Sequence, residues 1–80
     1  MKKIIKNIAT ALINLDLNFR KSTDINSTIF YIEDNNDFSI TILKGENAIE
    51  VFYFDTSIDK DFLGNNDSVK SATEIIRDFI

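Results

Sequence analysis

The 80-residue sequence contains no cysteine, no histidine and no proline, and only two glycines. Without cysteine the chain can form no disulfide, no thiolate nucleophile and no cysteine-ligated zinc or iron–sulfur site. Without histidine it lacks the commonest general base and a frequent metal ligand. Gly45 and Gly64 are too few to build a phosphate-cradling loop. From these absences we expect no enzyme, no cofactor and no metal site.

Length and composition indicate one small globular domain that spans residues 1–80. Apolar residues make up 44% of the chain and charged residues 28%, which is too hydrophobic for a disordered protein. No apolar run approaches the ~18 residues that a membrane span needs. The first five residues resemble the start of a signal peptide, but polar residues interrupt the next stretch and no small-x-small cleavage site follows. We therefore expect a complete, cytoplasmic protein.

The net charge of −4 is distributed unevenly along the chain. The first 21 residues hold five cations and one acid, whereas residues 22–67 hold ten acids and two lysines. An acidic middle of this kind repels phosphate backbones and attracts basic protein surfaces. We expect a protein partner with a basic surface, and no direct contact with nucleic acid.

Hydrophobic periodicity predicts a helix at each end of the chain. Apolar residues from Ile4 to Leu12 recur at helical spacing, and the helix is expected to end near Asn14. A second apolar stripe begins at Val69, and Asp67 or Ser68 can cap the helix that carries it. Between the helices, alternating or β-branched segments predict strands over 15–20, 28–33, 38–43 and 48–54.

Short polar segments separate the predicted strands. The Asn- and Asp-rich segment 34–37 and the segment 44–47, where Gly45 offers a permissive backbone, are typical of hairpin turns. Residues 55–66 are expected to form a longer loop. The predicted fold is therefore a two-layer α+β domain in the order α-β-β-β-β-α: a four-stranded antiparallel meander with both helices on one face.

The predicted core follows from this pattern. It lies between the helices and the sheet and comprises Ile5, Ile8, Leu12, Leu17, Phe19, Phe38, Ile40, Ile42, Ile49, Val51, Val69, Ala72, Ile76 and Phe79. Alternation then places Glu50, Phe52 and Phe54 on the opposite face, together with either Phe30 and Ile32 or Ile29 and Tyr31. Two explanations of this partly aromatic face remain open. The long loop folds across it through Ile58, Phe62 and Leu63, or the face is a protein contact or homodimer surface.

Three further patterns are explained by ordinary structure. The series Asp59-x-Asp61-x-x-Gly64-x-x-Asp67 is similar to a calcium loop, but Leu63 and Lys70 stand where oxygen ligands are required. Asp34 and Asp37 suit a hairpin turn, to which a contact role can be added. Lys2, Lys3 and Lys6 fit a solvated helix face.

In size, element order and charge, the whole chain resembles the small acidic proteins that phages use against host defences, anti-CRISPR proteins in particular. The acids that carry this resemblance are Glu33, Asp34, Asp37, Glu46, Glu50, Asp55, Asp59, Asp61 and Asp67. The resemblance implies a protein that occupies the nucleic-acid site of a nuclease, with carboxylates standing where phosphates would lie.

The leading hypothesis is a non-enzymatic inhibitor that binds a larger basic protein, such as a CRISPR effector or another nuclease complex. Its predicted partner-binding residues are Asp34, Asp37, Glu50, Phe52, Phe54, Asp55, Asp59 and Asp61. The alternatives are a homodimerising structural or accessory domain, a toxin immunity protein, and a nucleic-acid binder that uses the Lys2–Lys6 segment.

Overall fold

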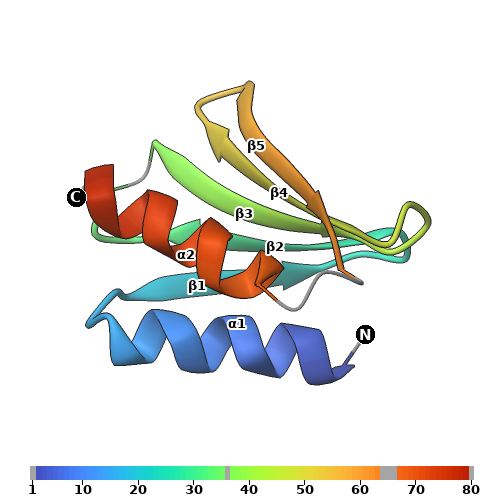
Figure 1. The fold of residues 1–80 in the computed structure, drawn as a ribbon, viewed down its shortest axis with the longest axis horizontal. Coiled ribbons are helices and arrows are strands. Elements are labelled where there is room, and N and C mark those ends of the chain that lie inside the picture. The colour runs from blue at the N-terminus through green and yellow to red at the C-terminus, as the bar shows by residue number, and fades with distance from the viewer. Residues whose placement is uncertain (1, 36, 64–66, 80) are drawn as a thin grey trace.

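A computed structural model describes residues 2–35, 37–63 and 67–79 of the chain (Figure 1). Asn36, Gly64, Asn65 and Asn66, which belong to the turn and loop segments predicted above, lie outside these residues, as do Met1 and Ile80. In chain order the described elements are α1 (Lys2–Asn14), β1 (Phe19–Thr23), β2 (Ser27–Ile32), β3 (Phe38–Leu43), β4 (Ala48–Tyr53), β5 (Thr56–Phe62) and α2 (Ser68–Phe79). The predicted α+β class, with two helices and an antiparallel sheet, is confirmed.

The sheet has five strands in the described residues, so the prediction of four is wrong. The strands lie side by side in chain order, each antiparallel to the next. The additional strand, β5, falls in the segment that was expected to be a loop. It follows β4 after a turn of only two residues, Phe54 and Asp55, which lacks the glycine or asparagine that such turns prefer. Phe54 itself takes the left-handed conformation, with a φ of 54°.

The first strand lies four residues later than predicted, because residues 15–17 close α1. The Leu17 N–H donates to the Leu12 carbonyl over 2.9 Å, and the Asp16 N–H donates to the Ile13 carbonyl over 3.0 Å. This is the Schellman arrangement of a helix C-terminus, and Asp16 provides its left-handed residue with a φ of 60°. Leu15 and Leu17 both pack on the core from this cap. Their alternation with polar residues therefore has the same pattern as a half-buried strand.

The turn between β3 and β4 uses a different residue from the one predicted. Asn47, with a φ of 51°, takes the left-handed conformation, whereas no described glycine does. Asparagine tolerates this conformation better than most residues. The turn is tied to the β1–β2 turn, because the Lys44 N–H donates to the Asn26 carbonyl over 3.0 Å and the Lys44 Nζ donates to the Asp24 carbonyl over 3.1 Å.

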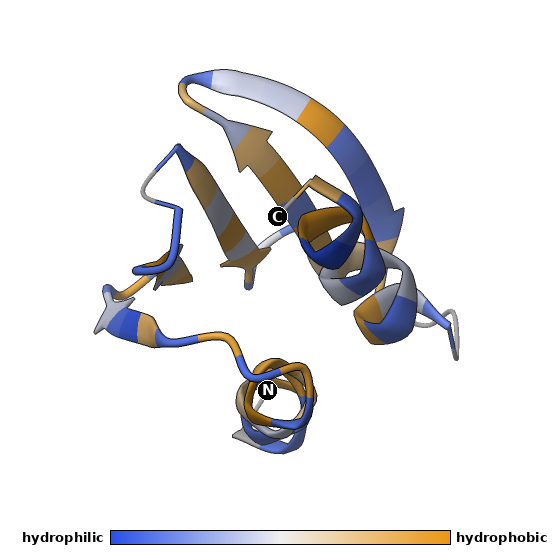
Figure 2. Cartoon of the chain, turned by 90° about the vertical axis from the view of Figure 1, so that its left-hand side faces the viewer, coloured by the Kyte–Doolittle hydropathy of each residue, from blue (hydrophilic) through white to orange (hydrophobic). Residues whose placement is uncertain are grey.

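One hydrophobic core joins both helices to one face of the sheet. In Figure 2 the sheet is curved, and both helices lie on its concave side. Phe30 and Ile32 are fully buried, which decides the open choice on β2. The buried cluster comprises Ile8, Leu12, Leu17, Phe30, Ile32, Phe38, Ile40, Ile42, Ile49, Val51, Ala72 and Ile76. Ile5, Phe19 and Val69 are only partly buried against it, and Phe79, predicted as core, is 64% exposed at the end of α2.

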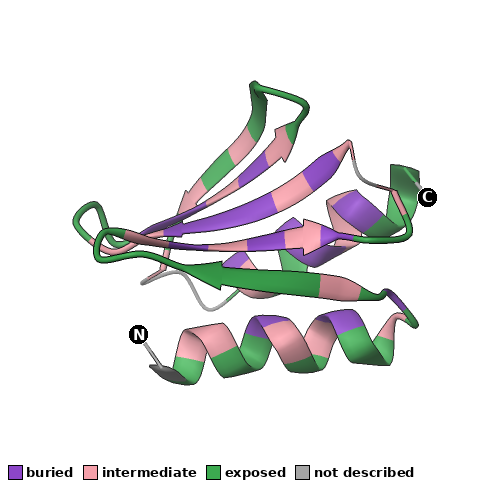
Figure 3. Cartoon of the chain, turned by 180° about the vertical axis from the view of Figure 1, so that it is seen from behind, coloured by how far each residue is buried: buried purple, intermediate pink, exposed green. Residues whose placement is uncertain are grey.

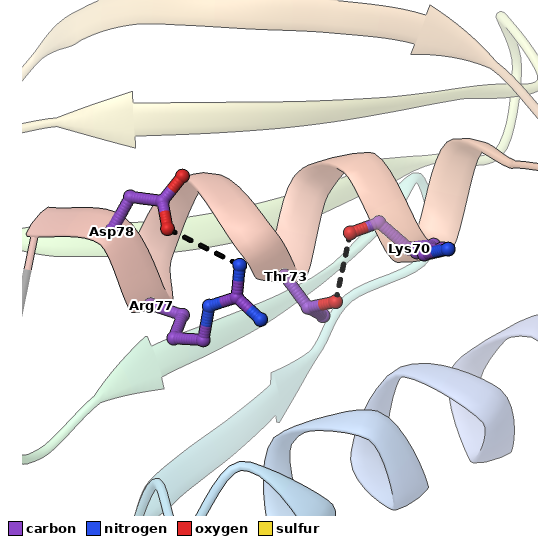
Figure 4. A network of polar contacts seen from close by, with 4 residues as sticks. All are labelled: Lys70, Thr73, Arg77 and Asp78. Atoms are coloured by element: carbon purple, nitrogen blue, oxygen red, sulfur yellow. Dashed lines mark hydrogen bonds and ion pairs between the residues drawn. The ribbon is translucent and has the colours of Figure 1, made fainter.

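Helix α2 begins as the sequence predicted and satisfies its buried polar groups. Asp67 is the N-cap residue, since its carbonyl accepts the first helical hydrogen bond from the Ser71 N–H over 2.8 Å. The buried Thr73 hydroxyl is within hydrogen-bonding distance of the carbonyl of Val69, at 2.9 Å, and of Lys70, at 3.2 Å (Figure 4). Within the described ranges, neither helix combines the length and hydrophobicity that crossing a bilayer requires.

Candidate functional site

The face of the sheet turned away from the helices is not covered by any described element. Figure 3 views the sheet from this side, with α2 behind it. Of the two explanations left open for this face, the one in which a long loop folds across it through Ile58, Phe62 and Leu63 does not hold, because the first two lie on β5 and extend the sheet, while Leu63 packs against the core. We call this surface the open face; its larger side chains are Arg20, Ile29, Tyr31, Leu43, Glu50, Phe52, Lys60 and Phe62.

A second exposed surface is formed by rings at one end of the sheet. The Phe38 ring lies at its centre, with ring centroids 4.9 Å from Tyr53 and 5.2 Å from Phe79. The Phe54 ring contacts Tyr53 edge to face at 4.6 Å. Ile58 joins them, because it lines the same hollow as Phe38, Tyr53 and Phe79. We call these five residues the aromatic end.

The aromatic end is exposed although its members contact one another. Tyr53 is 41% exposed, Phe54 62%, Ile58 39% and Phe79 64%, whereas Phe38 beneath them is buried. The hollow that Phe38, Tyr53, Ile58 and Phe79 line has a volume of about 360 Å³, and Asn35 contributes the polar part of its wall. A side chain of a partner could therefore enter between rings that are already in place.

Three aspartates are the immediate sequence neighbours of rings in the aromatic end. Asp37 precedes Phe38, Asp55 follows Phe54, and Asp78 precedes Phe79. The Asp37 carbonyl accepts a hydrogen bond from the Phe54 N–H over 2.7 Å, which joins the β2–β3 and β4–β5 turns. Asp78 is paired with Arg77 at 3.3 Å, and both side chains are more than half exposed (Figure 4). We call these three aspartates, which adjoin the rings in the chain, the acidic rim.

Asp34 has a structural role at the same end of the sheet. One carboxylate oxygen accepts a hydrogen bond from the Asn18 backbone N–H, and the other accepts one from the Asn18 side-chain amide over 3.3 Å. The Glu33 N–H donates a hydrogen bond to the Asn18 carbonyl over 2.8 Å. These bonds hold the β2–β3 turn against the segment that joins α1 to β1.

The predicted partner-binding residues fall on three different surfaces. Asp34, Asp37, Phe54 and Asp55 lie together on the turns at the aromatic end. Glu50 and Phe52 lie on the open face, opposite Thr41 and Ser39. Asp59 and Asp61 lie on β5 opposite Val51 and Ile49, and therefore on the helix-facing side of the sheet. The structure thus brings four of the eight together and separates the rest.

Sequence reasoning missed Tyr53, Ile58 and Phe79 as members of an exposed cluster. The spacing of Tyr53 and Phe79 fitted the core pattern of their elements, and both lie where that core ends. Ile58 is the extra residue of an irregularity in the β4–β5 pairing, next to Val51 and Phe52. A bulge of this kind re-aims a side chain, and no residue in the segment signals it.

The ionic chemistry of the described residues is that of an exposed surface. Lys60 Nζ lies 3.0 Å from Glu46 Oε1. This hydrogen bond, with the nearby charges of Glu46 and Glu50, raises the pKa of Lys60 against a smaller opposing effect of desolvation. Within the described ranges, no three acidic, histidine or cysteine side chains are grouped to hold a metal ion. Gly64, which the calcium-like pattern includes, lies outside those ranges.

Comparison of the chain with models of known protein families, with curated proteins and with solved structures gives no match.

Proposed function

We propose that this protein is a non-enzymatic antagonist that binds a larger protein through its aromatic end. The observation that carries the proposal is the exposure of four side chains grouped around the buried Phe38 ring, namely Tyr53, Phe54, Ile58 and Phe79, each between 39% and 64% exposed. Contiguous exposed apolar surface on a small protein commonly marks a binding site. Aromatic anchors that lose their water on binding supply most of the affinity of protein complexes.

The acidic rim defines the chemistry of the partner. Asp37 and Asp55 flank the rings, and Asp34 lies on the same turn as Asp37. Carboxylates around an apolar centre favour a partner with an apolar depression bordered by lysine or arginine. The charges guide the encounter, and the desolvated rings slow dissociation.

The backbone of Phe54 gives independent support for a contact role. A bulky side chain at a φ of 54° is strained, and asparagine or glycine would adopt this turn at lower cost. Strained residues concentrate where function requires a particular side chain. The position of Phe54 is therefore better explained by what its ring contacts than by what the turn needs.

We propose a nucleic-acid-handling complex of a bacterial defence system, such as a CRISPR effector, as the partner. Such complexes hold nucleic acid in positively charged channels, which match the acidic rim. The resemblance to anti-CRISPR proteins in size, element order and charge points to the same class. The basic first segment of the chain favours occlusion of a protein surface over imitation of a whole duplex.

Photocrosslinking from two matched positions tests where the partner binds. A benzophenone amino acid is placed at Phe54 or, as the control, at Ile25, which is 83% exposed on the β1–β2 turn at the other end of the sheet. In host cells we expect position 54, and not position 25, to form an adduct with a basic protein. The adduct should disappear when Asp37→Lys and Asp55→Lys are combined. Equal adducts from both positions would contradict the assignment of the site.

A phage plating assay tests the antagonist role. Cells that carry an active nuclease-based defence should become permissive when they express the wild-type chain or the control variant Ile25→Asn. They should stay resistant when they express Phe54→Asn. If the two variants protect phage equally, the aromatic end does not mediate the antagonism.

A further inference from the structure

We propose that the open face is a self-association surface on which a second copy of this chain packs. Its apolar side chains come from four neighbouring strands and lie in register. Tyr31 and Phe52 stand on either side of Ser39, and Leu43 and Phe62 stand on either side of Ala48, which is itself fully buried. Phe62 is the most exposed of them, at 68%. The face therefore carries apolar side chains from β2 to β5, interspersed with polar ones such as Ser39 and Thr41, and no described element covers it.

The charges of the open face favour a copy of the same chain as the occupant. The face carries two cations, Arg20 and Lys60, and one acid, Glu50, whereas the whole chain has a net charge of −4. In a two-fold dimer each copy supplies both signs to the other. A strongly acidic partner would meet Glu50 on this face, and a strongly basic partner would meet Arg20 and Lys60. Two copies that met instead through their acidic ends would repel each other.

Both cations of the open face already have partners within the chain. The Arg20 guanidinium lies 4.5 Å from the centre of the Tyr31 ring, and Lys60 forms its ion pair with Glu46 at 3.0 Å. Removing water from a charge costs less when a partner remains beside it. Glu50 lies opposite Lys60 in the β4–β5 register and acts on its charge, so that the face can be covered without leaving an isolated buried charge.

The size and shape of the open face predict a weak dimer. Five strands about 4.8 Å apart and about six residues long give a footprint of roughly 24 Å by 20 Å. Stable complexes bury about 800 Å² of accessible surface on each partner. The footprint is smaller than this in projection, and the face is the convex side of the sheet (Figure 2), so that two copies meet mainly at their centres. Association in the micromolar range or weaker is expected.

Phe52 and Phe54 provide a matched pair for the test, because they are two residues apart and lie on different surfaces. Phe52 points from β4 onto the open face, opposite Ser39, while Phe54 belongs to the aromatic end. Sedimentation equilibrium of the purified chain from about 10 µM to about 1 mM should give a mass that rises from 9.2 kDa toward twice that value. Phe54→Glu should behave as the wild type, and Phe52→Glu should remain monomeric.

Two further variants keep the test decisive if Phe52→Glu fails to fold. Phe62→Ser removes a side chain that is mostly exposed and should weaken the dimer without unfolding the domain. Glu50→Lys leaves three cations and no acid on the face and should weaken the dimer about tenfold, with stronger loss at low salt. A wild-type chain that stays at 9.2 kDa throughout overturns the proposal. So does a dimer that Phe54→Glu abolishes while Phe62→Ser and Glu50→Lys leave it unchanged.

Discussion

Replacing Phe54 with asparagine should leave the stability of the domain nearly unchanged while it removes partner binding. The substitution stabilises the backbone, because holding a bulky residue at a φ of 54° costs about 1–2 kcal/mol of folding free energy, and asparagine relieves most of this strain. The substitution also removes the packing of the ring, which contacts Tyr53 and is 62% exposed. The balance of backbone relief and lost packing sets the change in the free energy of unfolding.

The loss can be estimated from the buried part of the ring. A phenylalanine buries about 200 Å² when it is fully enclosed, so Phe54 buries roughly 75 Å². At about 25 cal/mol per Å² this is about 2 kcal/mol as an upper limit, of which the asparagine side chain keeps roughly half. The edge-to-face contact with Tyr53 adds about 0.5 kcal/mol. Gain and loss therefore cancel to within about 1 kcal/mol. Phe38→Ala, which empties a buried position in the same cluster, should instead cost about 3–5 kcal/mol.

Urea unfolding followed by circular dichroism measures both variants, because the chain has no tryptophan. With a slope of about 1 kcal/mol per M, the midpoint of Phe54→Asn should lie within about 1 M of the wild type. A destabilisation of more than about 2 kcal/mol would mean that the ring is held for its packing and would refute the strain argument. An unchanged stability together with unchanged crosslinking and antagonism would refute the contact role.

The remaining predictions concern three other positions. Asp16→Gly should stabilise the protein by about 0.5–1.5 kcal/mol in urea unfolding, because it relieves the left-handed strain and removes a negative charge from the C-terminus of α1; a loss of stability would show that the aspartate makes a compensating contact. Gly45→Ala should add about 0.4–1 kcal/mol by restricting the unfolded chain, since no atom lies within 4 Å of the new Cβ and the native φ is not positive; a lower melting temperature would contradict this. Glu46→Gln should bring the raised pKa of Lys60 back toward its ordinary value of 10.5 in an NMR titration. Because the folded pKa of Lys60 lies above the unfolded one, the pair stabilises the fold below the unfolded pKa, and that small contribution is lost as the pH rises through the folded pKa.

Helices and strands that bury one face in the core were predictable from the local pattern of apolar residues. In β3, apolar residues at every second position gave its bounds, because each of those side chains must face the core. The two helices and the antiparallel arrangement followed from helical spacing and short connections. The exclusion of disulfides and of cysteine or histidine chemistry needed only the composition. Where the burial of apolar side chains dominates within one element, the residues and their spacing are sufficient to predict that element.

Features that depend on long-range packing were not predictable in this way. Strand β5 has a polar sequence and a turn without glycine, so that only pairing with β4 makes it a strand. Phe30 and Ile29 are equally suited to a core, and the register with β1 and β3 decides which one is buried. The grouping of Asp37 and Asp55 beside exposed rings, and the separation of Phe52 from Phe54, arise because alternate turns of a meander meet at one end of the sheet. Local sequence encodes which side chains avoid water; the folded sheet alone determines which of the others become neighbours.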